Sequence, residues 1–207
     1  MAWQEITTVE ELTGLVGEPG ARAANKVRRT LHALDRDWLA ASPFCLVATS
    51  AADGTCDVSP KGDPAGFTYV IDDQTIAIAD RPGNRRVDGY RNLLSNPHVG
   101  LLFVVPGRGD TLRINGRARL VSEAPFFDDL VVQGHRPTLA VVIEVEEVFH
   151  HCSKAFLRSQ LWRPDTWAAG RVAPRPVIAH TLEPSDLSIE ELTVYYGPEY
   201  SRKLYSA

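Results

Sequence analysis

Apolar and polar side chains alternate through much of the chain between residues 44 and 149. An alternation of period two, as in TIAIA at residues 75–79, is typical of a β-strand with one buried face. The run VGLLFVV at residues 99–105 is apolar almost throughout and indicates a central strand. We therefore predict seven strands, at residues 44–50, 55–59, 67–71, 75–79, 99–105, 111–121 and 139–149.

Most of these strands are separated by short turn sequences. Ala51-Ala52-Asp53-Gly54 carries an Asp-Gly turn signal, and Asp72-Asp73 separates the next pair of strands. Successive hairpins imply an antiparallel sheet, and a sheet of this many strands is expected to close into a barrel that leaves no exposed edge. The predicted fold class is mainly β, an antiparallel, Greek-key-like barrel with flanking helices.

Helical patterns occupy the two ends of the chain. Thr8-x-x-Glu11 is a capping box, Glu18-Pro19-Gly20 interrupts the pattern, and a second helical segment is expected to run to about Ala41. Shorter helices are expected at residues 84–94, 125–133 and 185–194. We expect an N-terminal helical arm at 1–42, a barrel domain at 43–165, and a Pro-rich, aromatic extension at 166–207 that packs on the barrel or on a dimer partner.

Composition narrows the class of protein. The chain has 207 residues, 44% of them hydrophobic and 23% charged, which is typical of a soluble globular domain. Its net charge of -4 argues against a general nucleic-acid surface. An acidic N-terminal segment and the absence of a 20-residue apolar run favour a cytoplasmic protein without a membrane span. His150-His151-Cys152 is not expected to bind a metal, because adjacent strand residues point to opposite faces.

One basic cluster differs from this acidic background. The heptapeptide DRPGNRR, residues 80–86, follows a predicted strand and precedes a predicted helix. If Asn84 caps that helix, its free N–H groups together with Arg81 and Arg85 suit a phosphate. The alternative is a solvated turn with ion pairs to Asp80 and Asp88. Arg86 is expected to be a surface or ion-pair residue.

Three further segments carry basic or hydroxyl side chains. SPKGD at residues 59–63 ends a strand, and Arg113 lies on a later strand whose alternate positions are also basic. Lys154 and Arg158 are four residues apart on one helix face, and neither has a carboxylate at that spacing. Each of these segments alone is equally consistent with a solvated surface.

Together the segments resemble a known family. The blocks LVATSAADGTCDVSPKGD, IAIADRPGNRR, NLLSNPHVGLLFVVPG, LRINGRARLV and CSKAFLRSQLW occur in this order. They resemble the pyridoxamine 5'-phosphate oxidase-like FMN-binding split barrels, and more closely the bacterial FMN-dependent flavoproteins of that superfamily, over roughly residues 25 to 165. The resemblance implies an antiparallel split barrel and a homodimer with FMN at the subunit interface.

The resemblance also implies the cofactor-binding residues. Ser59, Pro60 and Lys61 match the strand-end loop along the flavin, and Arg81, Asn84 and Arg85 match the phosphate-binding segment. Arg113 falls on the strand that passes the isoalloxazine ring. Lys154, Arg158 and Ser159 match positions that the family tends to supply from the partner subunit. No residue is assigned as a catalytic acid or base.

The substrate does not follow from the family. The segment CDVSPKG lacks the arginine of true pyridoxamine 5'-phosphate oxidases, and YYGPEYSRKLYSA lacks their paired tryptophan and arginine, so vitamin B6 is not the expected substrate. The main hypothesis is an FMN-dependent oxidoreductase acting on a small molecule. The alternatives are a flavin-storage protein and a split barrel that uses F420 or haem. In the case of haem, His98, His150 or His151 would have to provide the axial ligand.

Overall fold

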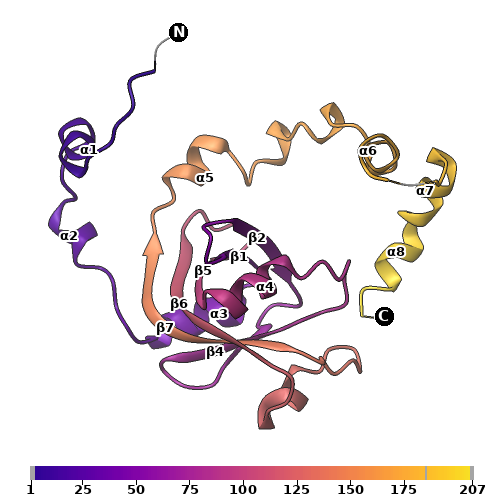
Figure 1. The fold of residues 1–207 in the computed structure, drawn as a ribbon, viewed down its shortest axis with the longest axis horizontal. Helices are drawn as coiled ribbons and strands as arrows, with labels where there is room; N and C mark the ends of the chain where they lie inside the picture. Colours follow the sequence, from indigo (N-terminus) through magenta and orange to yellow (C-terminus); the bar gives the residue numbers. More distant parts are fainter. Residues whose placement is uncertain (1–2, 185, 206–207) are drawn as a thin grey trace.

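The computed structural model describes residues 3–184 and 186–205. Short helices flank one β-sheet at both ends of the chain (Figure 1). The sheet strands are β1 (Phe44–Ser50), β2 (Cys56–Gly62), β3 (Thr68–Val70), β4 (Thr75–Ala79), β5 (His98–Val104), β6 (Thr111–Val121) and β7 (Ala140–His151). The helices are α1 (Val9–Val16), α2 (Ala21–Ala24), α3 (Ala33–Ala41), α4 (Asp88–Ser95), α5 (Lys154–Ser159), α6 (Arg175–Leu182), α7 (Ile189–Tyr195) and α8 (Pro198–Arg202), with 3₁₀ turns at Pro125–Leu130, Pro164–Thr166 and Ala169–Arg171.

All seven predicted strands are present, and every pairing between them is antiparallel. Their order in the sheet is β2-β1-β5-β6-β7-β4-β3. Four of the six connections join hydrogen-bonded neighbours, namely β1–β2, β3–β4, β5–β6 and β6–β7. β2 does not lie beside β3, and β4 lies beside β7 instead of β5. This placement of one strand beside the far end of a three-strand meander is a Greek-key arrangement.

The prediction that the sheet closes into a barrel is wrong for the described residues. β2 and β3 end the hydrogen-bonded order and do not pair with each other. Both edges have features that disfavour further pairing: β3 is only three residues long, and β2 carries Pro60, which has no N–H to donate. The sheet therefore leaves its edges open and protects them locally.

The sheet has an inner face that holds the core and an outer face with far fewer buried side chains. Cys45, Val47, Leu101, Phe103 and Ile114 are buried together on the inner face, where α3 contributes Trp38 and Leu39 to the same cluster. On the outer face of β1, β2 and β5, neighbouring side chains are only half-buried or exposed and belong to neither core cluster; they include Leu46, Val58, Pro60, Leu102 and Val104.

The N-terminal arm is less helical than predicted. The expected long second helix is replaced by α2 and α3, with an extended stretch between them that forms an isolated bridge from Arg28 to Val148 of β7. Leu31 and Leu39 are buried, whereas Val27 and Leu34 are exposed, so the predicted apolar stripe is not one helix face. Pairing with β7 holds this stretch extended.

The C-terminal extension departs from the sheet after β7. Helices α6 and α7 pack on each other, and Figure 1 shows α5 to α8 following an arc at a distance from the sheet before the chain returns toward it. The predicted helix at 125–133 is a 3₁₀ turn, Pro125–Leu130, and the helix predicted at 185–194 begins at Ile189. Residue 185 lies outside the described residues.

Candidate functional site

The basic segment 80–86 forms an irregular loop between β4 and α4. The predicted helix is present as α4, but it begins at Asp88 and ends at Ser95. Its predicted start at residue 84 and the N-cap role of Asn84 are therefore wrong, and Val87 occupies the N-cap position. The Asn84 Oδ1 instead accepts a hydrogen bond from the backbone N–H of Arg86, at 3.1 Å. A side chain committed to a local turn cannot also cap a helix that starts four residues later.

The backbone of this loop is strained. Arg85 and Val87 have φ angles of 60° and 52°, in the left-handed region that non-glycine residues rarely occupy. Each such residue costs on the order of 1–3 kcal/mol and persists only where surrounding contacts enforce it. Strain of this kind concentrates at binding and catalytic sites, which makes the loop a functional candidate.

Next to the loop, Lys61 belongs to a tight polar triad with Tyr90 and Asp80. The Lys61 Nζ donates to the Tyr90 hydroxyl at 2.6 Å and lies 3.2 Å from Asp80 Oδ1, and the Tyr90 hydroxyl donates to the same carboxylate at 2.5 Å. Burial and the hydrogen bond to Asp80 raise the pKa of Tyr90 well above its usual value. The triad therefore holds a charged lysine against a tyrosine that stays protonated.

Ser59 lies on the same face of β2 as Lys61, with α4 packed over it. A Cβ added to Gly89 would lie 3.3 Å from Thr49 Oγ1 and 3.7 Å from Ser59 Oγ. α4 therefore packs closely on the sheet at Gly89, where a side chain would need its neighbours to shift slightly. Pro60, between Ser59 and Lys61 on the strand, points to the outer face.

Arg81 is already engaged by neighbouring groups. Its Nε donates to Asp63 at 2.5 Å, and one Nη donates to the carbonyl of Leu130 at 2.8 Å. The Asp63 and Arg81 side chains are only 3% and 16% exposed. This places Arg81 beside the basic loop, with part of its donor capacity used, and its role in binding a phosphate stays a prediction.

The charge balance of this cluster leaves one cation over. Lys61 is paired with Asp80, Arg81 with Asp63, and the 75% exposed Arg86 with Asp88, as expected of a surface ion-pair residue. Within the described parts of the chain, Arg85 forms no ion pair or side-chain hydrogen bond. Its guanidinium is therefore available for an anionic ligand.

The remaining predicted residues lie elsewhere on the chain. Arg113 of β6 points to the outer face, donates to Asn115 Oδ1 at 3.1 Å and lies over the ring of Phe149. Lys154 and Arg158 on α5 are exposed and have no ion pair among the described side chains, while the Ser159 hydroxyl donates to the carbonyl of Phe156. Arg113 on β6 lies three strands away from Pro60 on β2. One chain therefore does not bring Arg113 together with the predicted residues of β2.

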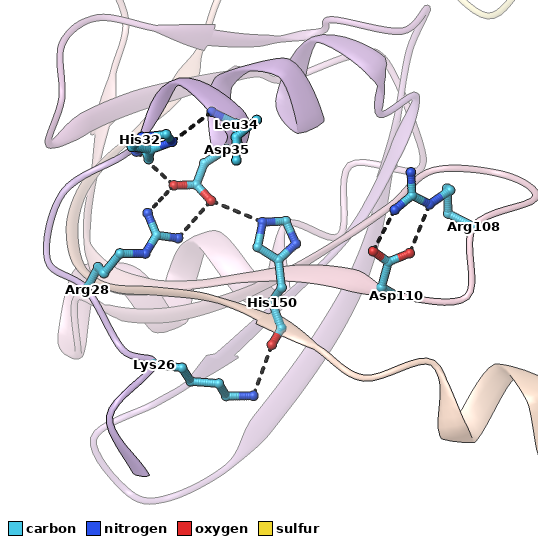
Figure 2. A network of polar contacts seen from close by, with 8 residues as sticks. All are labelled: Lys26, Arg28, His32, Leu34, Asp35, Arg108, Asp110 and His150. Carbon is cyan, nitrogen blue, oxygen red and sulfur yellow. Dashed lines mark hydrogen bonds and ion pairs between the residues drawn. The ribbon is translucent and has the colours of Figure 1, made fainter. Parts of the chain in front are cut away.

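The histidines considered as haem ligands are engaged elsewhere. Both ring nitrogens of His98 are in contact, with Asn96 Oδ1 and with Arg117. The His150 Nε2 lies 3.1 Å from Asp35, which also accepts two hydrogen bonds from Arg28 (Figure 2). His151 lies against Phe149, and burial together with Lys26 and Arg113 lowers its pKa. None of the three is free to turn its ring toward the basic loop without losing these contacts.

Sequence reasoning missed Asp63 and Tyr90 as members of the cluster, and it named Asp80 only as an ion-pair partner within a solvated turn. Asp63 and Asp80 stand inside the quoted segments SPKGD and DRPGNRR, but their pairing with Arg81 and Lys61 joins positions 18 and 19 residues apart. Nothing local in the sequence signals such pairs. Tyr90 lies on α4, six residues after Asn84, and only the true start of that helix places its hydroxyl on Lys61.

A comparison with family models identifies the chain's relatives. The model of the pyridoxamine 5'-phosphate oxidase family matches residues 31–152, more than half of the chain and all seven strands. The chain belongs to the pyridoxamine 5'-phosphate oxidase family. The match spans Ser59, Lys61, the 80–86 loop and Arg113, and it ends before α5. No curated protein sequence matches the chain.

Several solved structures are similar to part of the chain. HupZ of Group A Streptococcus is 22% identical, with a TM-score of 0.47, and the match covers 58% of this chain and 93% of HupZ. A putative pyridoxamine 5'-phosphate oxidase of Lactobacillus delbrueckii is 21% identical over 60% of this chain and 98% of that one, also with a TM-score of 0.47. An FMN-binding protein of Syntrophomonas wolfei is 13% identical over 57% and 89%, with a TM-score of 0.42. At these levels no residue role is transferred from them.

Proposed function

We propose that this member of the pyridoxamine 5'-phosphate oxidase family binds FMN at the 80–86 loop and is an FMN-dependent oxidoreductase acting on a small molecule other than vitamin B6. The observation that carries the proposal is Arg85 in a strained loop, which has no ion-pair partner among the described residues, whereas the other cations of the cluster each have a carboxylate partner. A phosphate monoester supplies the missing negative charge and accepts the two parallel hydrogen bonds that a guanidinium offers.

The position of Lys61 also supports binding of the isoalloxazine ring of FMN. Lys61 is held by Asp80 and Tyr90 at one side of the loop, and a fixed cation of this kind stabilises the negative charge that a flavin acquires near its N1 and O2 atoms on reduction. FMN, when bound, supplies hydride or electron transfer, so no protein nucleophile is needed. The role of the chain is to bind, to orient and to place charge.

We further propose a homodimer in which each FMN lies between two chains. Among the described residues, Lys154 and Arg158 have no acidic partner, and together with Arg113 they belong to the group of predicted residues that one chain does not bring to the loop. The outer face of β1, β2 and β5, with Leu46, Val58 and Leu102, lacks a covering element within the described chain. A second copy seated on this face accounts for both observations.

The binding role of Arg85 is tested by substitution. Arg85→Ala should weaken FMN binding about 10- to 100-fold, because it removes a charge-assisted hydrogen bond worth roughly 1.5–3 kcal/mol. The dissociation constant is measured by quenching of flavin fluorescence. Arg86→Ala is the matched control, since Arg86 is exposed and paired with Asp88, and it should change the constant less than about threefold, the free energy expected of a surface ion pair. Equal binding by the Arg85 variant and the wild type would overturn the assignment.

The cofactor and the catalytic role are tested separately. The absorbance spectrum of protein purified with its native cofactor distinguishes FMN from F420 and haem. Reduction of the bound flavin by NADH or NADPH, followed by reoxidation with an electron acceptor, supports an oxidoreductase. Bound flavin that accepts electrons from neither donor supports the storage alternative.

A further inference from the structure

The chain returns to the sheet at its C-terminal end. After α5 the extension follows an arc away from the sheet, and the segment Pro198–Tyr205 brings it back (Figure 1). Tyr205 is half-buried, whereas the residues 198–204 before it are exposed. The Tyr205 side chain therefore anchors the end of the extension.

The seat of Tyr205 is built from three separate parts of the fold. Its hydroxyl donates to Asp63 Oδ1 in the loop after β2, and its ring stacks with His135 in the β6–β7 connection at 6.0 Å between centroids. The guanidinium of Arg81 lies 5.7 Å from the centroid of the same ring. The hydrogen bond to Asp63 raises the pKa of Tyr205, so the hydroxyl keeps its proton for this contact.

This seat encloses Arg81 at the edge of the basic loop. Asp63 divides its two oxygens between Arg81 and Tyr205, and Leu130 accepts from a second donor of Arg81. The Tyr205 ring covers the guanidinium as well. Only the second terminal nitrogen of Arg81 has no partner among the described atoms. The Nε–H of Arg81 is committed to Asp63, so an anion that binds this edge of the guanidinium must displace that carboxylate.

Few side chains of the described C-terminal extension are buried. Helices α6 and α7 bury Ala179 and Leu192 against each other, and α8 has no buried residue. A segment with so few buried apolar contacts opens at a low free energy compared with the sheet. Tyr205 leaves its seat without disturbing either core cluster.

We propose that the segment Pro198–Tyr205 is a strap that closes over Arg81, with Tyr205 as its latch, and that an anionic ligand enters the basic loop when the strap opens. The closed strap keeps Arg81 on Asp63. Release of Tyr205 frees one face of the guanidinium and one oxygen of Asp63. The part of this inference that concerns the ligand rests on the proposed binding of FMN; the strap itself does not.

Hydrogen exchange of the whole protein without added ligand tests the strap. Tyr205→Ala should raise the exchange rate at least fivefold in the peptides that contain residues 63–66 and 132–135, which hold two parts of the seat. Tyr205→Phe keeps the ring and loses the hydroxyl, so its effect should be intermediate. Tyr200→Ala is the control, because Tyr200 contacts Tyr195 and Tyr196 within the extension and should leave both peptides unchanged.

Unchanged exchange in Tyr205→Ala, or an equal effect of Tyr200→Ala, would contradict the strap. The wild-type rates at two protein concentrations tenfold apart should agree, because the seat lies within one chain. If protection of these peptides from exchange rises with protein concentration, the strap within one chain is contradicted. The segment would then contact the seat of a second copy.

The ligand step is tested by the rate of FMN association, followed by stopped-flow fluorescence. Tyr205→Ala should increase the association rate constant at least fivefold over the wild type and Tyr200→Ala. An unchanged or slower rate would contradict control of entry by the strap. If the wild type does not bind FMN at all, the proposed function fails, while the exchange experiment still decides whether the strap exists.

Discussion

At the scale of single residues, the most buried charge is the carboxylate of Asp35 on α3. It is 1% exposed, accepts from both terminal nitrogens of Arg28 and from the backbone N–H of His32, and contacts His150 (Figure 2). Burial alone would raise the pKa of Asp35, but the hydrogen bonds from Arg28 and His32 outweigh it and hold the pKa below its usual value. This network fastens the extended stretch before α3 to β7.

Substituting Asp35 should destabilise the fold strongly. Asp35→Asn leaves Arg28 without its carboxylate and should lower the free energy of unfolding by about 3 kcal/mol, measured by urea denaturation at pH 7. Asp73→Asn, which removes an exposed partner of Arg36, is the control and should cost less than about 1 kcal/mol. Similar losses in the two variants would contradict the role of burial.

The same network gives a direction for the pH dependence. A carboxyl whose pKa is lowered in the folded state stabilises the protein above its unfolded pKa, and that stabilisation is lost as the pH falls through the folded pKa. Acid below about pH 4 should therefore destabilise the wild type more than Asp35→Asn. Parallel stability curves for the two proteins between pH 6 and pH 3 would show that Asp35 does not contribute.

At the scale of elements, β6 and β7 meet at a bulge that only glycine permits. The register shifts between Asn115 and Gly116, and a Cβ on Gly116 would lie 2.0 Å from the backbone oxygen of Glu144. Backbone atoms of a central strand cannot move away as a flexible side chain can. The bulge therefore links the sequence RINGR directly to the curvature of the sheet.

Gly116→Ala should cost about 1–3 kcal/mol of stability through overpacking. The measurement is the midpoint of thermal or urea unfolding. Gly100→Ala on the neighbouring strand is the matched control, because its Cβ would meet the side-chain oxygen of Asn115 at 3.4 Å, an ordinary contact. A Gly116 variant as stable as the Gly100 variant would show that the bulge tolerates a side chain.

At the scale of the whole molecule, one chain covers only part of its apolar surface. The outer face of the sheet exposes Val58 to 62%, and α1 has no buried residue. Figure 1 places α1 and α2 to one side of the sheet and α6 to α8 to the other. Within the described residues, none of the helices has the length and apolar character to cross a membrane. The proposed cover of the outer face is a second copy.

A charge placed on this face should separate the proposed dimer. Val58→Glu should reduce the native mass from twice the chain mass of 22.8 kDa to a single chain mass, measured by light scattering after gel filtration. Ser122→Glu, at an exposed position just after β6, should leave the dimer intact. A wild type that already has the mass of one chain, or a Val58 variant that stays dimeric, would contradict the outer face as the interface.

Local patterns in the sequence were sufficient to predict the strands and the N-cap of the first helix. The ranges 44–50, 75–79 and 111–121 are confirmed to the residue, as is the Thr8 capping box. Alternation and capping involve neighbours only a few residues apart, so their physical cause lies within the segment that shows them. Asn84 failed as a cap because an equally local turn competes for its side chain.

Only the tertiary structure decided which partners the charged side chains take. The pairs Arg81–Asp63 and Lys61–Asp80, and the contact of Tyr205 with Asp63 across 142 positions, depend on the order of strands and on the path of the C-terminal extension. The open sheet edges are also a property of that order. A sequence pattern records the side chains that a segment offers, whereas ion pairs form between groups that the fold brings within a few ångströms. The basic residues of DRPGNRR were therefore visible from the start, but only the fold showed that Arg85 is the one without a counter-charge among the described residues.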